Sequence, residues 1–219
     1  NNDPTIPHSS SWGLTNQAIT DLCHTTHPAI TTFESKLTRL FPNFIVTRLP
    51  EAVFGPTVSP LTANAPVAGD SFDWHIDADP YQTPPGMWTD IYGRYPNRAR
   101  GKPRFMSCLL YVQDDPHGSW GDGTFGATTK FVDPPTEEVY EVTPTAGRLV
   151  MMDQDITHSV TAPKEVAGGR PRYSLVWKLV LHPKVGGQVM TDLNQGRGVW
   201  PDRFFFGSAA AAAGGGAGV

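Results

Sequence analysis

The residues with the clearest potential for chemistry are His75 and Asp77, in the stretch Trp74-His75-Ile76-Asp77. Residues two apart in a β-strand project from the same face, so we expect this imidazole and this carboxylate to point together. Both groups suit a divalent first-row metal, and a distant second histidine would complete a three-ligand set on one face of the ion. His158 is the candidate, because neighbouring strands of a β-barrel can bring it alongside the pair. The pattern predicts a metal centre with three protein ligands.

A second chemical feature is Arg172, which opens the stretch Arg172-Tyr-Ser-Leu-Val-Trp177. The two-residue period of a strand puts Arg172 and Ser174 on one face. A guanidinium on the inner face of a barrel needs an anion, and its planar fork matches a carboxylate. The chain offers no obvious acidic partner nearby, so we expect the carboxylate of a ligand. Arg170 is the alternative anchor; the strand alternation favours Arg172, and the choice stays open at this stage.

The elements that must position these residues are helices first and short strands later. Apolar residues recur at helical spacing from Thr15 to Leu40, and Pro28 divides this segment into two helices. Later runs have strand character, separated by Pro, Gly and Asp clusters. The order favours an α+β, mainly β domain with a closed or double-layered sheet. The expected strands are residues 44–49, 74–77, 105–112, 139–142, 148–152 and 173–181.

Two segments differ from the rest of the chain. Residues 79–103 are expected to form a long loop, and its many aromatic residues favour a functional lid. Residues 208–219 are an Ala/Gly tract with nothing to bury, which indicates a tail or linker. The chain opens on Asn1 rather than Met, which indicates a sequence trimmed at its N-terminus.

Composition limits the classes of protein that this chain can be. It has 219 residues, 17 Lys plus Arg, 21 Asp plus Glu and a formal net charge of −4. These values argue against a disordered polyelectrolyte and against a strongly basic nucleic-acid binder. No apolar run reaches the ~20 residues of a membrane helix, so no membrane partner is expected. The compartment is not determined by these features.

The chain resembles the Fe(II)- and 2-oxoglutarate-dependent dioxygenases, and within them the prolyl 4-hydroxylase-like branch. Four motifs carry the resemblance and occur in the family's order: His75-x-Asp77, Gly126-Ala-Thr-Thr-Lys-Phe131, His158 and Arg172-Tyr-Ser-Leu-Val-Trp177. The resemblance covers roughly residues 44–183. The chain departs from the pattern at Ala127, where a second glycine is usual, and in its longer spacing between motifs, which implies inserted loops.

The resemblance implies a double-stranded β-helix, the jelly-roll or cupin-like fold, with N-terminal helices packed on it. It implies one domain over residues 1–207, with a helical part at about 14–41 and the barrel at about 44–183. It also implies an Fe(II) centre, 2-oxoglutarate as cosubstrate, O2 and ascorbate as reductant. The activity would be hydroxylation of an unactivated C–H bond, with release of succinate and CO2.

The resemblance further assigns roles to individual residues. Tyr111 matches a tyrosine that hydrogen-bonds the distal carboxylate of the cosubstrate, and Ser174 is a further donor. A prolyl residue of a peptide or protein is the implied substrate, and a small molecule would use the same metal centre. The residues expected at the substrate entrance are aromatic: Trp74, Trp88, Tyr92 and Tyr95.

Two other functions remain open from the sequence. A non-catalytic cupin-like module would use the same barrel to bind a sugar or peptide. A metal-dependent isomerase or hydrolase would hold zinc or manganese with the same two histidines and Asp77. An inward-facing Arg172 argues against the non-catalytic module, and iron-dependent succinate release would separate the oxygenase from the isomerase or hydrolase.

Overall fold

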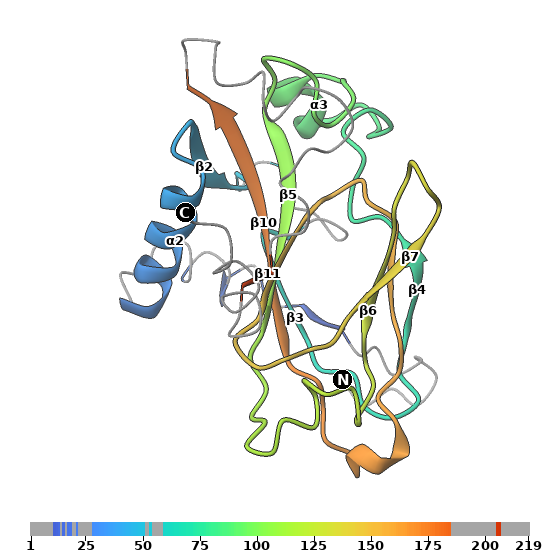
Figure 1. Ribbon diagram of the computed structural model, residues 1–219. Coiled ribbons are helices and arrows are strands. Elements are labelled where there is room, and N and C mark those ends of the chain that lie inside the picture. The colour runs from blue at the N-terminus through green and yellow to red at the C-terminus, as the bar shows by residue number, and fades with distance from the viewer. Residues whose placement is uncertain are drawn as a thin grey trace, which may run out of the picture.

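The chain folds into two antiparallel β-sheets that face each other, with one long helix outside them (Figure 1). The computed structural model describes residues 11–13, 15, 17–18, 21, 28–50, 53, 59–184 and 205–206. The elements in chain order are β1 (Ser11–Gly13), α2 (Pro28–Leu40), β2 (Phe44–Arg48), β3 (Leu61–Asn64), β4 (Phe72–His75), α3 (Met87–Tyr92), β5 (Arg104–Tyr111), β6 (Thr129–Val132), β7 (Val139–Val142), β8 (Leu149–Asp153), β9 (His158–Val160), a short 3-10 helix (Glu165–Ala167), β10 (Ser174–Pro183) and β11 (Phe205–Phe206).

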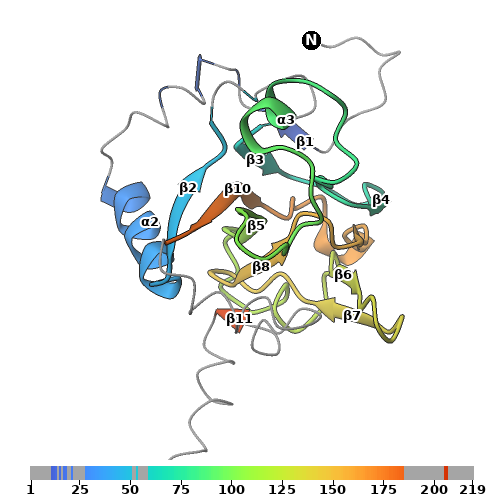
Figure 2. The same ribbon diagram turned by 90° about the horizontal axis from the view of Figure 1, so that it is seen from above.

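The two sheets differ in size and together form the predicted double-stranded β-helix. The larger has the order β1-β3-β10-β5-β8-β11, and β2 also pairs with β10. The smaller has the order β4-β9-β6-β7. Seen from above, β5, β8 and β10 of the larger sheet lie on one side, and β4, β6 and β7 of the smaller sheet lie on the other (Figure 2). The chain is mainly β, so the predicted fold class is confirmed.

The alternation of side chains along β10 and β5 decides what enters that interior. The strands pair so that Trp177 lies opposite Cys108 and Lys178 lies opposite Ser107. Trp177 and Cys108 belong to the core cluster beneath α2. Their strand neighbours therefore project to the opposite face, into the space between the sheets. The inner face of the large sheet carries polar side chains as well as apolar ones.

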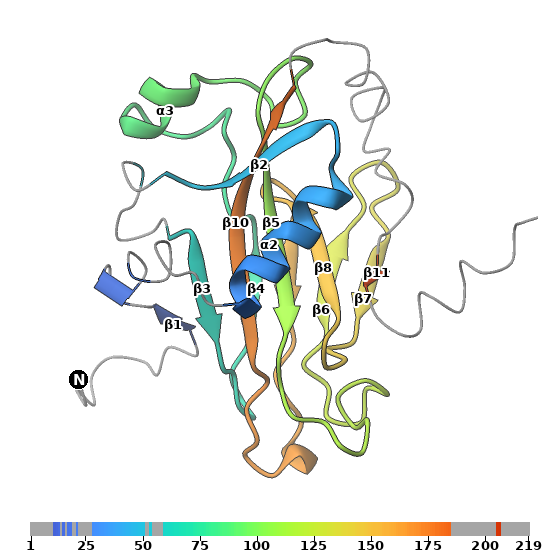
Figure 3. The same ribbon diagram turned by 90° about the vertical axis from the view of Figure 1, so that its left-hand side faces the viewer.

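Helix α2 covers the outer face of the large sheet (Figure 3). It begins at Pro28, as the sequence predicts, because proline fits the first turn of a helix, where no backbone N–H bond is lost. Leu37 is 1% exposed, and the rings of Phe33 and Trp177 lie 4.7 Å apart. The helix predicted before Pro28 falls mostly outside the described residues, as does the tail at 208–219.

The segment 79–103 is more ordered than the predicted loop, because it contains α3. This helix has six residues, too few for a helical period to be recognised in the sequence. It stands above one end of the sheets (Figure 1). Trp88 and Tyr95 are each 6% exposed and pack with Phe105 in a hydrophobic cluster. Packing on the barrel, rather than helix propensity, fixes this segment.

Most predicted strands agree with the observed ones within two residues, and β7 agrees at both ends. The strand predicted at 74–77 is wrong at its end, because β4 stops at His75 and Asp77 lies in a bend beyond it. The Asp77 and Ala78 amides both donate to the carbonyl of Gln154, at 2.9 and 3.0 Å. These bonds end the strand, because the backbone turns to meet a single acceptor.

The packing of α2 makes a prediction about stability. Leu37→Ala should lower the free energy of unfolding by about 2–5 kcal/mol, because it leaves a cavity under a buried side chain. Leu40→Ala, on the same helix at 36% exposure, should lower it by less than about 1 kcal/mol. Urea denaturation of both variants checks this, and equal losses would show that α2 does not dock as described.

Candidate metal centre and anion site

The three predicted metal ligands, His75, Asp77 and His158, meet in the structure. One ligand atom from each lies within 4.8 Å of the others. His75 and His158 are direct partners in the β4–β9 pairing, and their ring centroids lie 4.3 Å apart. Asp77 reaches them from the bend after β4. Two imidazoles and one carboxylate are a donor set that suits a divalent first-row metal.

Both imidazoles are oriented by backbone carbonyls. His75 Nδ1 lies 2.6 Å from the Asp73 carbonyl, and His158 Nδ1 lies 2.9 Å from the Ile156 carbonyl. A carbonyl oxygen only accepts, so each Nδ1 carries the proton and each Nε2 keeps its lone pair. Hydrogen bonds of this kind fix the tautomer and direction of metal-binding histidines.

A buried ion-pair network fixes the turn that leads to His158. Asp153 ends β8 and accepts bonds from Arg104 Nε at 2.5 Å and from Arg98 Nη1 at 3.0 Å. The following residue, Gln154, is 1% exposed and donates through Nε2 to the Met106 carbonyl at 3.1 Å. The same Gln154 carbonyl holds the backbone at Asp77. One turn therefore positions ligands from both sides of the site.

The second oxygen of Asp77 is held by two residues that the sequence did not single out. Ser107 Oγ donates to Oδ2 at 2.5 Å, and Lys178 Nζ forms an ion pair with the same oxygen. Burial alone would raise the pKa of Asp77, but the charge of Lys178, together with the hydrogen bonds from Lys178 and Ser107, lowers it below its ordinary value. Asp77 is therefore a carboxylate at neutral pH.

His158 is poised to bind a metal because it is neutral. Burial lowers its pKa below the ordinary value of 6.5, and the attraction of Asp77 opposes this only in part. Only the neutral ring offers an Nε2 lone pair to a metal. Burial thus keeps His158 in its ligating form.

Arg172 lies buried in the interior, as the strand alternation predicts, although β10 begins two residues later. It is 1% exposed and donates through Nη2 to Thr129 Oγ1 at 3.1 Å, and its guanidinium lies 4.8 Å from the Tyr111 ring centroid. No Asp or Glu among the described residues pairs with it. Arg172 Nε and Ser174 Oγ are buried without a hydrogen-bond partner. A buried cation beside two unsatisfied polar atoms is costly without an anion.

Tyr111 contacts Arg172 through its ring and Thr129 through its hydroxyl. It is fully buried, and its hydroxyl shares a hydrogen bond of 2.7 Å with Thr129 Oγ1. Thr129 therefore joins Tyr111 to Arg172, a role that the sequence reasoning missed. The signal was present, since Thr129 lies within the motif Gly126–Phe131.

The alternative anchor, Arg170, lies on the surface. It is exposed, and its guanidinium lies 5.5 Å from the Phe125 ring centroid. Of the two arginines, only Arg172 enters the interior.

The aromatic residues expected at the substrate entrance differ in their burial. Trp88 and Tyr95 are buried against Phe105, and Tyr92 is half-buried in the same cluster. These three residues pack together in one hydrophobic cluster with Phe105. Trp74 differs: it is 48% exposed and adjoins the ligand His75.

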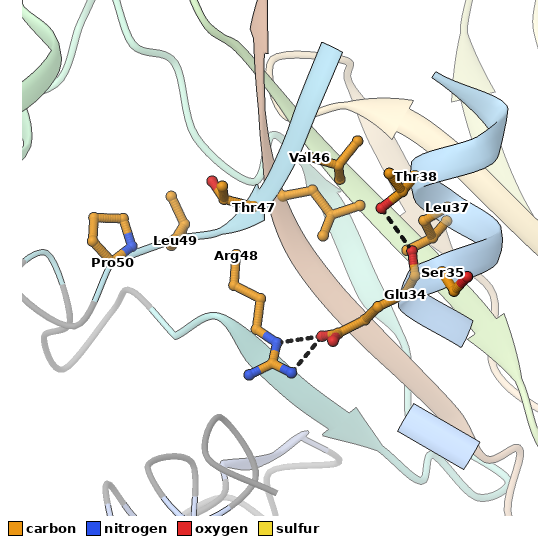
Figure 4. Close-up of a pocket in the computed structure, with 10 residues that line it drawn as sticks. Glu34, Ser35, Leu37, Thr38, Val46, Thr47, Arg48, Leu49 and Pro50 are labelled. Atoms are coloured by element: carbon orange, nitrogen blue, oxygen red, sulfur yellow. Dashed lines mark hydrogen bonds and ion pairs between the residues drawn. The ribbon is translucent and has the colours of Figure 1, made fainter. Parts of the chain in front are cut away.

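A cavity of about 540 Å³ lies on the outer side of the large sheet, between α2 and β2 (Figure 4). Arg48 and Glu34 form an ion pair at its edge. Its lining residue Leu179 points away from the interior, whereas its neighbour Lys178 points toward Asp77. This cavity is therefore separate from the metal centre.

Comparison with known families agrees with this geometry. The family model described as the 2OG-Fe(II) oxygenase superfamily matches residues 62–177, more than half of the chain. The chain belongs to this superfamily. The description of this superfamily names iron(II) and 2-oxoglutarate, and the matched span runs from β3 through β10.

Solved structures similar to this chain include two prolyl hydroxylases. A *Trichoplax adhaerens* prolyl hydroxylase in complex with a hypoxia inducible factor peptide fragment is 17% identical, with a TM-score of 0.42, over 71% of this chain and 56% of that one. A *Pseudomonas putida* prolyl-4-hydroxylase is 17% identical, with a TM-score of 0.36, over 78% and 68%. A *Burkholderia pseudomallei* 2OG-Fe(II) oxygenase is 14% identical, with a TM-score of 0.41, over 71% and 59%.

The chain spans less than two thirds of the Trichoplax adhaerens and Burkholderia pseudomallei chains. No protein of curated function matches its sequence. Among the described residues, no helix has the length and apolar character needed to cross a membrane.

The burial of His158 predicts how the stability of the metal-free protein depends on pH. Below about pH 6.5 this histidine becomes protonated in the unfolded chain but stays neutral in the folded protein until a lower pH. Because the unfolded state then binds more protons, the free energy of unfolding falls as the pH drops. His158→Gln lacks this effect. As the pH falls from 8 to 5, the free energy of unfolding of the wild type should decrease relative to that of the variant. The decrease should be about 1.4 kcal/mol for each unit by which burial lowers the pKa of His158.

Urea denaturation in the presence of a chelator, at intervals from pH 8 to 5, measures this difference. A difference that stays constant over the whole range would contradict a buried, neutral His158.

Proposed function

We propose that this oxygenase hydroxylates an unactivated C–H bond of a prolyl residue in a peptide or protein, with release of succinate and CO2. The observation that carries the proposal is the meeting of His75, Asp77 and His158 in the same interior as the unpaired guanidinium of Arg172. A three-ligand metal centre and a buried carboxylate receptor are what an iron enzyme with a diacid cosubstrate requires.

In this proposal His75, Asp77 and His158 hold Fe(II). The support is the donor set and the two Nδ1 bonds that direct Nε2 toward a common point. Three protein ligands leave three positions on a six-coordinate ion for other molecules. A metal-dependent isomerase or hydrolase would need no buried guanidinium at this place.

Arg172 is proposed to hold the distal carboxylate of 2-oxoglutarate, assisted by Tyr111 and Ser174. The support is the partnerless Arg172 Nε and Ser174 Oγ, which a carboxylate would satisfy. Thr129 orients both Arg172 and Tyr111 through its hydroxyl. Ascorbate is proposed as the reductant that keeps the iron in its ferrous form.

The separation of the two sites suits a short diacid. Thr129 lies two residues along β6 from Phe131, and Phe131 is the register partner of His158. Two residues of a strand span about 7 Å. A five-carbon diacid with its distal carboxylate at Arg172 can thus reach the metal ligands from within the barrel.

When bound, iron and 2-oxoglutarate supply oxidative decarboxylation, with one oxygen atom of O2 going to succinate and the other to the substrate C–H bond. The chain's own contribution is to position the cosubstrate and to exclude water. The buried His158, Tyr111 and Arg172 form the dry side of the site. His75 and Trp74 are exposed and form the open side, where we propose that the substrate enters.

The proposal of a prolyl substrate is based on the motif resemblance to the prolyl 4-hydroxylase-like branch.

We further propose that residues 1–207 form one domain and that residues 208–219 are a tail or linker.

The first test is anaerobic loading with Fe(II) and 2-oxoglutarate. Wild type should develop a visible metal-to-ligand charge-transfer band, which His75→Ala and Asp77→Ala abolish. Arg172→Ala should weaken 2-oxoglutarate binding roughly 100-fold, because losing a buried charge pair costs about 2–5 kcal/mol.

Arg170→Ala is the matched control, since it removes an exposed arginine two residues away. It should leave the affinity for 2-oxoglutarate unchanged. Equal losses in both arginine variants, or an unchanged band in the ligand variants, would overturn the site assignment.

The second test concerns the substrate. Proline-containing peptides should stimulate succinate formation by the iron-loaded oxygenase, and mass spectrometry should find one added oxygen on proline. The same peptides with alanine in place of proline are the control. Stimulation by both sets alike would refute prolyl specificity while leaving the oxygenase itself intact.

A further inference from the structure

We propose that Lys178 and Ser107 are positioning residues that make Asp77 bind the metal through one oxygen only. They occupy Oδ2, so that Oδ1 alone is offered to the ion and the neighbouring coordination position stays open for the cosubstrate. This inference rests on the proposed function, and it adds two residues that the family's motifs do not include.

The three side chains form a closed triangle. Ser107 Oγ donates to Asp77 Oδ2 at 2.5 Å, Lys178 Nζ pairs with the same Oδ2, and Nζ donates to Ser107 Oγ at 2.9 Å. Asp77 Oδ1 accepts no hydrogen bond from any residue in the described part of the chain. The carboxylate is therefore divided into one engaged oxygen and one available oxygen.

The triangle is set by strand register. Lys178 and Ser107 are direct partners in the β10–β5 pair, and both project into the interior. The backbone of Lys178 is held on its other side too, since its N–H donates to Pro60 at 2.8 Å and its carbonyl accepts from Leu49 at 3.2 Å. The backbone that carries the ammonium group is therefore held in place by the segments that contain Pro60 and Leu49.

Burial makes the lysine's partner obligatory. The side chains of Lys178 and Asp77 are 13% and 17% exposed. A lysine at such a position is unfavourable unless a carboxylate and a further acceptor satisfy it. Among the described residues, Asp77 is the carboxylate that pairs with Lys178. The ammonium group is therefore expected to stay bound to Asp77 Oδ2.

Coordination number gives this contact a function. A carboxylate with two free oxygens can bind a metal through either one or both. Two-oxygen binding here would take one of the three positions that the protein ligands leave open. A keto acid that chelates needs two of these positions and O2 needs the third, so the set is complete only with one-oxygen binding.

A purely structural ion pair would behave differently from a positioning pair. Loss of a structural pair would loosen Asp77 and weaken metal binding and cosubstrate binding together. Loss of a positioning pair frees Oδ2 and removes a positive charge near the metal, so metal binding is kept or strengthened. Only the cosubstrate binds more weakly, because it must compete with Asp77 Oδ2 for a coordination position on the metal.

The experiment uses Co(II) as the probe ion and visible spectroscopy with calorimetry as readouts. Lys178→Met should bind Co(II) at least as tightly as wild type, with an altered ligand-field spectrum. The affinity of the Co(II)-loaded protein for 2-oxoglutarate should fall roughly tenfold or more. Lys178→Arg keeps a cation on Oδ2 and should restore both the spectrum and the affinity.

Lys130→Met is the matched control. It removes a lysine whose Nζ pairs with Glu141 at 2.9 Å on the smaller sheet, away from Asp77. Its Co(II) spectrum and its affinity for 2-oxoglutarate should equal those of wild type.

Ser107→Ala keeps the ion pair and serves if Lys178→Met does not fold. It should lower the affinity for 2-oxoglutarate about threefold without weakening Co(II) binding. The proposal is overturned if the folded variants lose both affinities together or lose neither. A wild type that binds Co(II) independently of His75 instead refutes the proposed metal centre, so the two failures are distinguishable.

Discussion

The pairing of β4 with β9 is the interaction on which the site depends. It places His75 directly opposite His158, so that two imidazoles distant in sequence share one face of the small sheet. The bend after β4 and the turn after β8 then meet at the Gln154 carbonyl, which brings Asp77 to the same point. A shift of one residue in this register would turn one imidazole to the opposite face and destroy the donor set.

The interior of the large sheet contains two buried cations with different partners. Lys178 is neutralised within the chain by Asp77, whereas Arg172 has no carboxylate among the described residues. Both side chains lie on the inner face of the β10 segment, together with Ser174. In our proposal, Lys178 positions the metal ligand Asp77, and Arg172 binds the distal carboxylate of the cosubstrate. This division of roles is consistent with membership of a family that binds iron(II) and a diacid.

Much of the fold and part of the site could be predicted from two-residue alternation. It identified the late strands and the inward direction of Arg172 and Ser174. The same alternation extends to Lys178, yet its importance depends on Asp77 and Ser107, which lie on other elements and meet it only in three dimensions. Helix α3 escaped prediction because packing of Trp88 on Phe105, rather than a sequence period, stabilises it. Asp77 was assigned to a strand because a carbonyl acceptor that bends the backbone leaves no signal in the sequence.

The central claim is that one ion contacts three separated side chains while a diacid extends from it to Arg172. A crystal structure with Mn(II) and 2-oxoglutarate, using anomalous scattering to locate the metal, tests this most directly. The account predicts a single anomalous peak bonded to His75, Asp77 and His158, with the distal carboxylate of 2-oxoglutarate paired with Arg172. A peak elsewhere, or a cosubstrate whose distal carboxylate lies away from Arg172, would contradict it.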